Sequence, residues 1–503
     1  MAVVGGGIIG CGVARDAALR GLRVALFERR DFGSGTTAAS TRIVHGGLRY
    51  LEMLDFGLVR LDLHERETLL RIAPHLVKPL EFLIPLFEGG AVHRLKLRIG
   101  LRLYDLLSSD KRLPGHRMLS AAEARAADPA LDRPGLAGAA AYYDARVDSP
   151  ERLCVENLID AGDHGARVFN YCELVSAVTS GGAVSGVRVR DTLDGSELDV
   201  RARVVVNATG PWFETVDGLL TRTPSGRIRT TKGIHIVCPP LTTRALVLFS
   251  KLDSRLVFAI PRLGETWIGT TDTDHAGDPG KVSATRDEVR YLIDSVRHVF
   301  PTLTADDVLF TTAGVRALVM RGGKASSVSR MHKVVDGAAS AVSGVVSILG
   351  GKITGYRAIA EEATDVVCRQ LGVEKRSVTA DTPLPGARGD HAQPSDLYDL
   401  YGSLADRIVA LTRTEPDLAV PLSPKYPDIA AQVVFAVRFE HCVKLADFLR
   451  RRTLLGARAD QGEQAAVPAA SLMARELRWS AERTAAEIDE YRKDIEKTRT
   501  FRS

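Results

Sequence analysis

Three glycines near the N-terminus have the type and spacing that nucleotide binding requires. Gly5, Gly7 and Gly10 form a G-x-G-x-x-G pattern between a β-branched apolar stretch and a segment with helical spacing. Glycines at these positions let the backbone approach a pyrophosphate, whose charge the N-terminus of the following helix stabilises. Glu28 ends the next apolar stretch, where a carboxylate accepts a hydrogen bond from a ribose hydroxyl. The pattern predicts a dinucleotide site. The alternatives are a tight turn without a ligand, or NADP bound through the arginines at 29–30, although Glu28 would repel its 2′-phosphate.

Two later turns have a similar small-residue character. The stretch 204–212 reads as a buried strand that ends in N-A-T-G-P-W, and Gly350–Thr354 opens a helix late in the chain. A helix N-terminus aimed at the pyrimidine edge of a flavin would stabilise the negative charge of the reduced ring. Each turn alone could be an ordinary loop. Together with the first motif they indicate a flavin-binding fold built from separate segments of the chain.

A fourth stretch, Ser40–Glu52, combines glycines with a cation. It reads S-T-R-I-V-H-G-G-L-R-Y-L-E. Its glycines permit close packing on a flat cofactor, and Arg49 offers a rigid bidentate fork for a phosphate. Two plain alternatives stay open: His45 as a structural histidine and Arg49 as a partner in a surface ion pair.

The elements that must position these turns divide the chain into an α/β part and a helical part. Strand-like alternation across 245–271, broken by a turn at 262–265, predicts an antiparallel sheet separate from the nucleotide-binding sheet. We therefore expect a Rossmann-like, two-dinucleotide-binding-type FAD domain with a central parallel sheet over residues 1–382. Substrate-binding segments of roughly 75–145 and 211–330 are interleaved with it. Composition shifts near residue 383, and residues 383–503 are expected to form a C-terminal α-helical domain.

Composition narrows the class of protein. The 503 residues carry a net charge of +5 that is spread along the chain, which suits an anionic substrate or membrane surface better than nucleic acid. The six cysteines contain no C-x-x-C pair, so neither a zinc site nor another metal site is expected. No apolar run reaches the roughly 18 residues of a membrane span, and the N-terminus does not resemble a secretory signal. We expect a cytoplasmic protein.

Residues 94–107 have the pattern of a helix that lies on a membrane. Arg94, Arg98 and Arg102 recur every four residues, and leucine or isoleucine side chains cover most of the remaining surface. A helix with a basic stripe and a wide apolar face can lie in a bilayer interface. The alternative is a buried helix with one wet face. The membrane reading predicts peripheral attachment to the inner face of the cell membrane.

Taken together, the chain resembles the FAD-dependent, quinone-linked glycerol-3-phosphate dehydrogenases over nearly its whole length. HGGLRYLE with VNATGPW is the most specific part of the resemblance. The other matching stretches are the opening Gly5–Gly10, APHL at 73–76, KGIHIV at 232–237, IGTTDT at 268–273, GVR at 314–316, Ser329-Arg330, GGKITGYR at 350–357 and RRRTLL at 450–455. The sequence departs from the family at Gly355, Ala317 and Arg42, where threonine, proline and lysine are common.

The resemblance implies a role for each matching residue. His235 would be the general base, Arg316 would stabilise the alkoxide that develops at C2, and Lys352 would complete the catalytic group. The expected substrate ligands are Arg49, Tyr50, Thr271, Asp272, Arg316 and Arg330. The expected FAD ligands are Gly5, Gly7, Gly10, Glu28, Thr37, Ser40, His45, Gly46, Leu48, Ala208, Gly210, Trp212, Gly351, Lys352, Ile353 and Thr354.

The implied reaction is the oxidation of sn-glycerol 3-phosphate to dihydroxyacetone phosphate, with hydride transfer from C2 to FAD. A membrane quinone would take the electrons, and a homodimer without nucleic-acid partners is expected. Three other readings stay open. They are a glycerol-3-phosphate oxidase that uses oxygen, an amine or amino-acid oxidase of the same fold, and a flavoprotein that binds FAD structurally and docks a partner.

Overall fold

The computed structural model describes residues 1–48, 51, 55–87, 91–108, 111–221, 226–320, 332–337, 342–389 and 395–502, without the side chains of 91–93. Three expected phosphate ligands, Arg49, Tyr50 and Arg330, lie outside the described residues. Within the described residues, no helix is long and apolar enough to cross a membrane.

A six-stranded sheet carries the first glycine motif. Its strand order is β18-β19-β11-β1-β2-β7, and all neighbours are parallel except β18 and β19. Helix α1 packs between α6 and α9, which places one apolar core beside the sheet. The strands are β1 (Ala2–Val4), β2 (Ala25–Phe27), β7 (Arg167–Phe169), β11 (Val205–Asn207), β18 (Lys333–Asp336) and β19 (Val345–Leu349); the helices are α1 (Ile8–Leu19), α6 (Pro150–Asp163) and α9 (Tyr356–Leu371). The predicted parallel sheet is confirmed.

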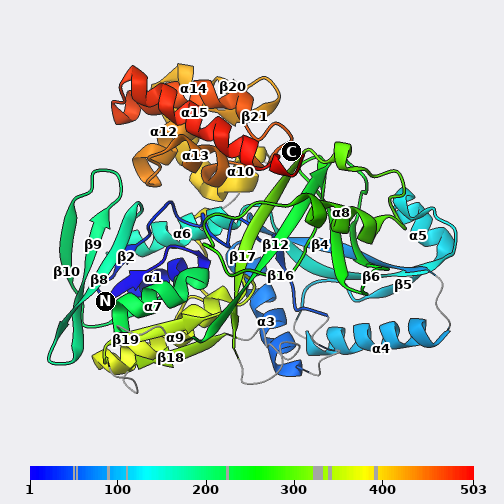
Figure 1. Cartoon of the computed structure of the whole chain (residues 1–503), viewed down its shortest axis with the longest axis horizontal. Helices are drawn as coiled ribbons and strands as arrows, with labels where there is room; N and C mark the ends of the chain where they lie inside the picture. Colours follow the sequence, from blue (N-terminus) through cyan, green and yellow to red (C-terminus); the bar gives the residue numbers. More distant parts are fainter. Residues whose placement is uncertain are drawn as a thin grey trace.

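A three-stranded antiparallel sheet flanks this domain at the left of Figure 1. It consists of β8 (Cys172–Ser180), β9 (Ala183–Asp191) and β10 (Glu197–Arg201), and α7 (Phe213–Thr221) packs on β8. These strands separate β7 from β11 in the sequence. The parallel sheet is therefore assembled from distant segments: β2 pairs with β7 and β11 pairs with β19, each about 140 residues further along the chain.

A ten-stranded, largely antiparallel sheet forms the other half of the α/β part. Its order is β16-β12-β15-β14-β13-β4-β6-β3, with β17 on β12 and β5 on β6. The strands are β3 (Ile43–Val44), β4 (Val77–Phe87), β5 (Arg117–Ser120), β6 (Leu136–Val147), β12 (Ile228–Cys238), β13 (Ala245–Phe249), β14 (Leu256–Arg262), β15 (Glu265–Gly269), β16 (Thr273–Asp274) and β17 (Phe310–Val319). The antiparallel sheet expected over 245–271 is thus confirmed.

Among the described residues, four helices accompany this sheet. They are α3 (Phe56–Ile72), α4 (Ala91–Leu107), α5 (Ala121–Ala127) and α8 (Arg286–Val296). Asp55 accepts a hydrogen bond from Leu58 N at the start of α3, and a capping box formed by Thr285 and Glu288 opens α8. Figure 1 shows α4 along the lower edge of the molecule, far from the C-terminal helices at the top.

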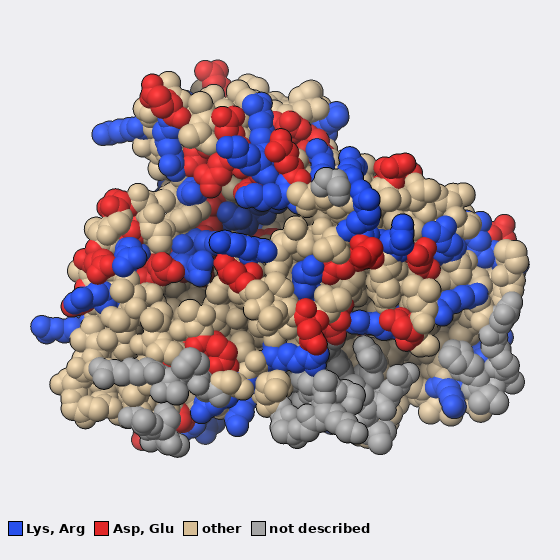
Figure 2. Space-filling model, viewed as in Figure 1, with Lys and Arg blue, Asp and Glu red and all other residues tan. Residues whose placement is uncertain are grey.

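The C-terminal helices pack on the parallel-sheet domain. They are α10 (Asp396–Tyr401), α11 (Ala405–Thr414), α12 (Ala430–Phe439), α13 (Leu445–Asp447), α14 (Glu463–Leu477) and α15 (Ala481–Lys497), with a hairpin of β20 (Pro421–Ser423) and β21 (Tyr426–Ile429). Their apolar side chains continue the core that surrounds α1 and α6. Figure 2 shows a hollow beneath this domain with Lys and Arg side chains gathered around it.

Asp31 makes one of the polar contacts between the two parts. It is fully buried and accepts hydrogen bonds from Arg452 at 2.8 Å and from Arg451 at 2.5 Å. Burial alone would raise the pKa of Asp31, but the two guanidinium groups lower it to about 2. A charged cluster thereby joins the loop after β2 to the C-terminal domain.

Candidate cofactor and substrate site

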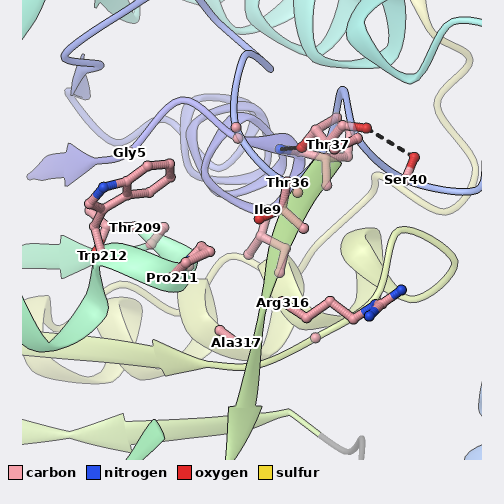
Figure 3. Close-up of a pocket in the computed structure, with 18 of the residues that line it drawn as sticks. Gly5, Ile9, Thr36, Thr37, Ser40, Thr209, Pro211, Trp212, Arg316 and Ala317 are labelled. Atoms are coloured by element: carbon pink, nitrogen blue, oxygen red, sulfur yellow. Dashed lines mark hydrogen bonds between the residues drawn. The ribbon is translucent and has the colours of Figure 1, made fainter. Parts of the chain in front are cut away.

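A cavity of about 400 Å³ lies at the carboxyl ends of the parallel strands. Its walls come from the turns after β1, β11 and β19, the segment after β2, and β17 of the antiparallel sheet. In open α/β sheets this edge is where ligands bind. Figure 3 shows Trp212 at one end of the cavity and Arg316 at the other. The folding of distant segments therefore brings the predicted turns together around one space.

The glycine motif fits close backbone packing. Gly5 has φ of +104°, and a Cβ on Gly10 would lie 1.9 Å from the carbonyl oxygen of Gly5. Gly10 therefore sets the approach of α1 to the turn and does not line the cavity itself. Gly7 does line it, and beside it Ile8 N donates to Thr37 Oγ1 at 3.2 Å. The N-terminus of α1 thus faces the cavity.

Glu28 lies at the end of β2 and lines the same cavity. Its carboxylate accepts hydrogen bonds from Gly6 N at 2.7 Å and Arg30 N at 2.9 Å. Burial raises its pKa, and these two backbone hydrogen bonds oppose the rise. Carboxylate oxygens have further lone pairs, so Glu28 is able to accept from a ribose hydroxyl as well.

The loop that carries Thr37 and Ser40 is fixed by Arg42. Arg42 donates to both carboxylate oxygens of Glu151, at 2.8 and 2.6 Å, and to the carbonyl oxygens of Ala38 and Asp148. Only a guanidinium has enough donors in this planar arrangement. The arginine at this position therefore has a structural function that a lysine would not reproduce.

The segment after β3 is held from two sides. Thr354 Oγ1 accepts a hydrogen bond from His45 N at 3.1 Å, which ties this segment to the turn after β19. Gly46 N donates to Tyr104 Oη at 2.9 Å, and a Cβ on Gly46 would lie 2.6 Å from Leu63. Gly46 and Leu48 thus pack toward α3 and α4, and they are not among the residues that line the cavity.

Lys352 lines the cavity and is paired with a buried carboxylate. Its Nζ lies 2.6 Å from Asp62 Oδ2, and Asp62 on α3 is only 2 % exposed. Burial raises the pKa of Asp62 to about 6, while Lys352 and His332 act to lower it and Glu65 acts to raise it. Asp62 therefore fixes where the lysine charge stands relative to the cavity.

Arg316 on β17 is held by three oxygen acceptors. It donates to Thr270 Oγ1 at 2.8 Å, to the Thr271 carbonyl at 3.1 Å and to Asp272 Oδ1 at 3.3 Å. A Cβ on Gly233 of the neighbouring strand would lie 2.3 Å from the guanidinium, so glycine leaves the space in which the side chain lies. The guanidinium is thereby fixed at the end of the cavity.

His235 on β12 is 2 % exposed and is not among the residues that line the cavity. Its Nε2 lies 3.1 Å from Thr41 Oγ1 and its Nδ1 lies 3.3 Å from Thr312 Oγ1. Burial first, and then Arg316 and Arg42, lower its pKa to about 3. The imidazole is therefore neutral at physiological pH, and it meets the cavity through the Thr41 hydroxyl, which does line it.

The structure thus brings most predicted residues to one cavity. Gly5, Gly7, Glu28, Thr37, Ser40, His45, Ala208, Gly210, Trp212, Arg316, Gly351, Lys352, Ile353 and Thr354 line it. Gly10, Gly46, Leu48, His235, Thr271 and Asp272 stand one layer behind and support residues that do. Sequence reasoning missed Asp62 and Thr41, because each matters only through a contact across the fold.

The cavity suits FAD. A glycine turn and the N-terminus of α1 face the position of a pyrophosphate, and Glu28 stands where a ribose would lie. Trp212 lines the cavity as well. Lys352, in the turn after β19, lines the same cavity and would stabilise the negative charge of the reduced ring. Backbone donors and cations around one cavity match a dinucleotide whose reduced ring is anionic.

Comparison with known proteins defines the class. Residues 1–357 match the model of the FAD dependent oxidoreductase family, and residues 377–484 match the C-terminal domain of alpha-glycerophosphate oxidase. A glycerol-3-phosphate dehydrogenase of Synechocystis is 39 % identical, with 98 % of this chain and 96 % of the relative covered. One of Mycobacterium leprae is 37 % identical, with 98 % and 87 % covered.

A solved structure leads to the same family. The glycerol-3-phosphate dehydrogenase from Bacillus halodurans complexed with FAD superposes with a TM-score of 0.78, at 28 % identity, over 99 % of this chain and 94 % of that one. The chain belongs to the FAD-dependent glycerol-3-phosphate dehydrogenase family. Its cofactor is FAD, as the sequence resemblance predicted.

Proposed function

We propose that the protein oxidises sn-glycerol 3-phosphate to dihydroxyacetone phosphate. The observation that carries the proposal is that one cavity has both a cation and a base beside it: Arg316 is fixed at its end, and the neutral imidazole of His235 lies behind Thr41. An alcohol oxidation needs a base for the hydroxyl proton and a cation for the developing alkoxide. Relatives named glycerol-3-phosphate dehydrogenase, matched over nearly the full chain, support the choice of substrate.

Each proposed role follows from chemistry. When bound, FAD supplies a hydride acceptor. His235 takes up the proton of the C2 hydroxyl by way of the Thr41 hydroxyl, which lies 3.1 Å from its Nε2. Arg316 stabilises charge on the C2 oxygen, and Thr271 and Asp272 hold Arg316 in place. Lys352, anchored by Asp62, stabilises negative charge at the cofactor edge.

Arg49, Tyr50 and Arg330 are proposed to bind the substrate phosphate, on the strength of the sequence alone. Arginine suits this task because its planar fork donates two parallel hydrogen bonds. Arg49→Ala should raise KM for glycerol 3-phosphate about 10- to 100-fold and leave FAD content unchanged. An unchanged KM would contradict the assignment.

An anaerobic titration tests the proposed function. Purified holoenzyme is mixed with glycerol 3-phosphate while the flavin absorbance is followed, with glycerol as the control that lacks the phosphate. Bleaching by glycerol 3-phosphate, and none by glycerol at the same concentration, is expected. No bleaching would overturn the substrate and the roles of His235 and Arg316, and would favour a flavoprotein with a structural cofactor. Bleaching by an amino acid instead would favour an amine or amino-acid oxidase.

We further propose that a membrane quinone is the electron acceptor. In the same titration, the bleached enzyme should recover its absorbance rapidly with a soluble quinone analogue and slowly with air. Rapid recovery in air with formation of peroxide would identify an oxidase instead. The predicted homodimer is tested by the molar mass of the holoenzyme in solution.

Attachment to the inner face of the cell membrane is proposed through α4. Leu95 and Ile99 are 56 % exposed and Leu106 is 70 % exposed, whereas Leu101 and Tyr104 on the opposite side are buried. The arginines at 94, 98 and 102 are exposed as well. Apolar and basic side chains on the same wet face suit the boundary of an anionic bilayer, where leucine inserts and arginine meets phosphate. This exposure favours the membrane reading of 94–107 over the buried-helix alternative.

Liposome flotation measures this attachment. The protein should float with vesicles that contain anionic lipid, and replacing Arg94, Arg98 and Arg102 together by glutamate should abolish flotation. Replacing Arg188 and Arg190, which are exposed on the three-stranded sheet and paired with carboxylates, is the matched control. Equal flotation of the wild type and the α4 variant would contradict the proposal.

A further inference from the structure

A second cavity, of about 290 Å³, lies between β17 and the C-terminal domain. Its walls include Thr312 of β17, Trp267 of β15, and Asp494 and Lys497 at the end of α15. Lys497 has a side chain that is 71 % exposed, so this wall reaches the protein surface. The cavity is therefore placed to hold water that exchanges with solvent.

His235 stands between the two cavities and lines neither. Its Nε2 contacts Thr41, which lines the cofactor cavity, at 3.1 Å. Its Nδ1 contacts Thr312, which lines the second cavity, at 3.3 Å. Each ring nitrogen of this buried imidazole thus contacts the hydroxyl of one threonine, and the two threonines line different cavities.

Thr312 is held in place from the C-terminal side. Its neighbour Thr311 donates hydrogen bonds to the carbonyl oxygen of Thr498 through both N, at 2.9 Å, and Oγ1, at 2.7 Å. These bonds join β17 to the segment after α15. They fix the strand at the point where the Thr312 hydroxyl meets the imidazole.

We propose that Thr41, His235 and Thr312 form a proton exit that carries the substrate hydroxyl proton from the cofactor cavity to the second cavity. The inference rests on the proposed function. A threonine hydroxyl both accepts and donates a hydrogen bond, and a neutral imidazole accepts at one nitrogen and donates at the other. The network is therefore complete when Nδ1 carries the proton and Nε2 accepts.

The step balances atoms and charge. As the hydride leaves C2 for the cofactor, the C2 hydroxyl proton moves to Thr41 Oγ1 and the proton of Thr41 moves to Nε2 of His235. The proton on Nδ1 moves to Thr312 Oγ1, whose own proton passes to water in the second cavity. His235 ends neutral in its other tautomer, and one proton reaches solvent for each hydride transferred.

The surroundings of His235 explain why an exit is needed. The charged groups that face the imidazole are Arg316 from β17 and Arg42 from the loop before β3, both cationic, and burial also disfavours its protonated form. An imidazolium that kept its proton would therefore be costly. A relay that passes the proton onward avoids that charge.

The test compares threonine variants in the anaerobic reaction. Thr312→Val keeps the shape of the side chain and removes its hydroxyl. Bleaching by glycerol 3-phosphate should slow at least about tenfold, with a larger solvent deuterium isotope effect and an unchanged KM, because proton transfer now limits the rate. Thr312→Ser should restore both the rate and the isotope effect. Thr364→Val is the matched control, because Thr364 is a buried threonine of α9 whose hydroxyl donates to the Ala360 carbonyl and which lines neither cavity; this variant should bleach at nearly the wild-type rate.

The outcomes separate the two proposals. If the wild type bleaches and Thr312→Val bleaches equally fast with the same isotope effect, the proton exit is wrong and the proposed function stands. Thr312→Val could instead be slow with a raised KM and an unchanged isotope effect, and Thr312→Ser could fail to restore the rate. In that case Thr312 has only a packing role and the exit is wrong. If the wild type is not bleached, the proposed function fails and the exit fails with it.

Discussion

At the scale of single residues, Asp62 shows how a site residue acts from behind the cavity. It is buried on α3 and contacts Lys352 at 2.6 Å. Its pKa of about 6 lies above the ordinary value of 3.8, because burial disfavours the carboxylate more than Lys352 stabilises it. The native protein therefore holds a proton at Asp62 more tightly than the unfolded chain does.

This shift predicts a pH dependence of stability. Since the folded pKa is raised, the carboxylate reduces stability progressively as pH rises from about 4 to above 6. Asp62→Asn removes that titration. We compare the free energy of unfolding of the wild type with that of Asp62→Asn. The difference, wild type minus variant, should fall by on the order of 1 kcal/mol between pH 5 and pH 8. Denaturant unfolding of both proteins at the two pH values measures it, and a difference that rises with pH would contradict the shift.

The types and spacing of the residues predicted much of the site. They predicted few of the contacts between those residues. The turns around Gly5, Gly210 and Lys352 could be read from sequence because small residues before a helix have few other uses. Asp62 and Lys352, which are in contact, lie 290 residues apart in the sequence. Thr41 and His235 lie 194 residues apart. No local pattern marks such a pair, because the fold alone creates it.

At the scale of elements, neighbouring strands carry glycine where a functional side chain needs room. Gly233 on β12 lies beside Arg316, and Gly269 on β15 lies beside His235, with a Cβ in either case 2.3 Å from the side chain. The register sets these neighbours, since His235 pairs with Gly269 and Gly233 pairs with Gly314. The alternation of 245–271 predicted strands, but it did not predict their order or register, on which these glycines depend.

Gly233→Ala tests this arrangement. The added methyl group should displace the Arg316 guanidinium, and a displacement of about 1 Å lowers the rate of flavin reduction by about 10- to 100-fold. FAD content should not change, because Gly233 belongs to β12 and not to the turns after β1 and β19 that are expected to hold FAD. Ala317→Gly, which removes a methyl group from the same cavity wall, is the control and should change the rate less. A wild-type rate in Gly233→Ala would show that Arg316 tolerates displacement.

At the scale of the whole molecule, the contact between Asp31 and the arginines at 451–452 joins the two ends of the chain. Asp31 has a folded pKa of about 2, so its contribution to stability is present above pH 4 and is lost as pH falls toward 2. Removing one partner of a buried ion pair leaves the other charge uncompensated, at a cost of about 3–5 kcal/mol. The sequence placed a domain boundary near 383 but gave no sign of this cluster.

Asp31→Asn should therefore loosen the C-terminal domain. At pH 7 its unfolding midpoint should fall strongly, and limited proteolysis should release a fragment that ends near residues 372–395. Asp199→Asn is the control, because Asp199 pairs with Arg188 on the surface and both side chains are about half exposed. Such a pair contributes at most about 1 kcal/mol. Similar melting of the two variants would show that the buried cluster is not what joins the domains.

The order of strands in the parallel sheet has a consequence for synthesis on the ribosome. β1 pairs with β11 and β11 pairs with β19, so the edge that binds FAD needs residues 2–4, 205–207 and 345–349 together. A nascent chain holds the first glycine turn hundreds of residues before it holds the last. Cofactor loading must therefore await nearly the complete polypeptide, and a chain that stops before Val345 lacks both β19 and the following turn that contains Lys352. Nonsense products of this gene would be apoproteins that added FAD does not rescue, and their exposed β11 edge would make them targets for chaperones and proteases.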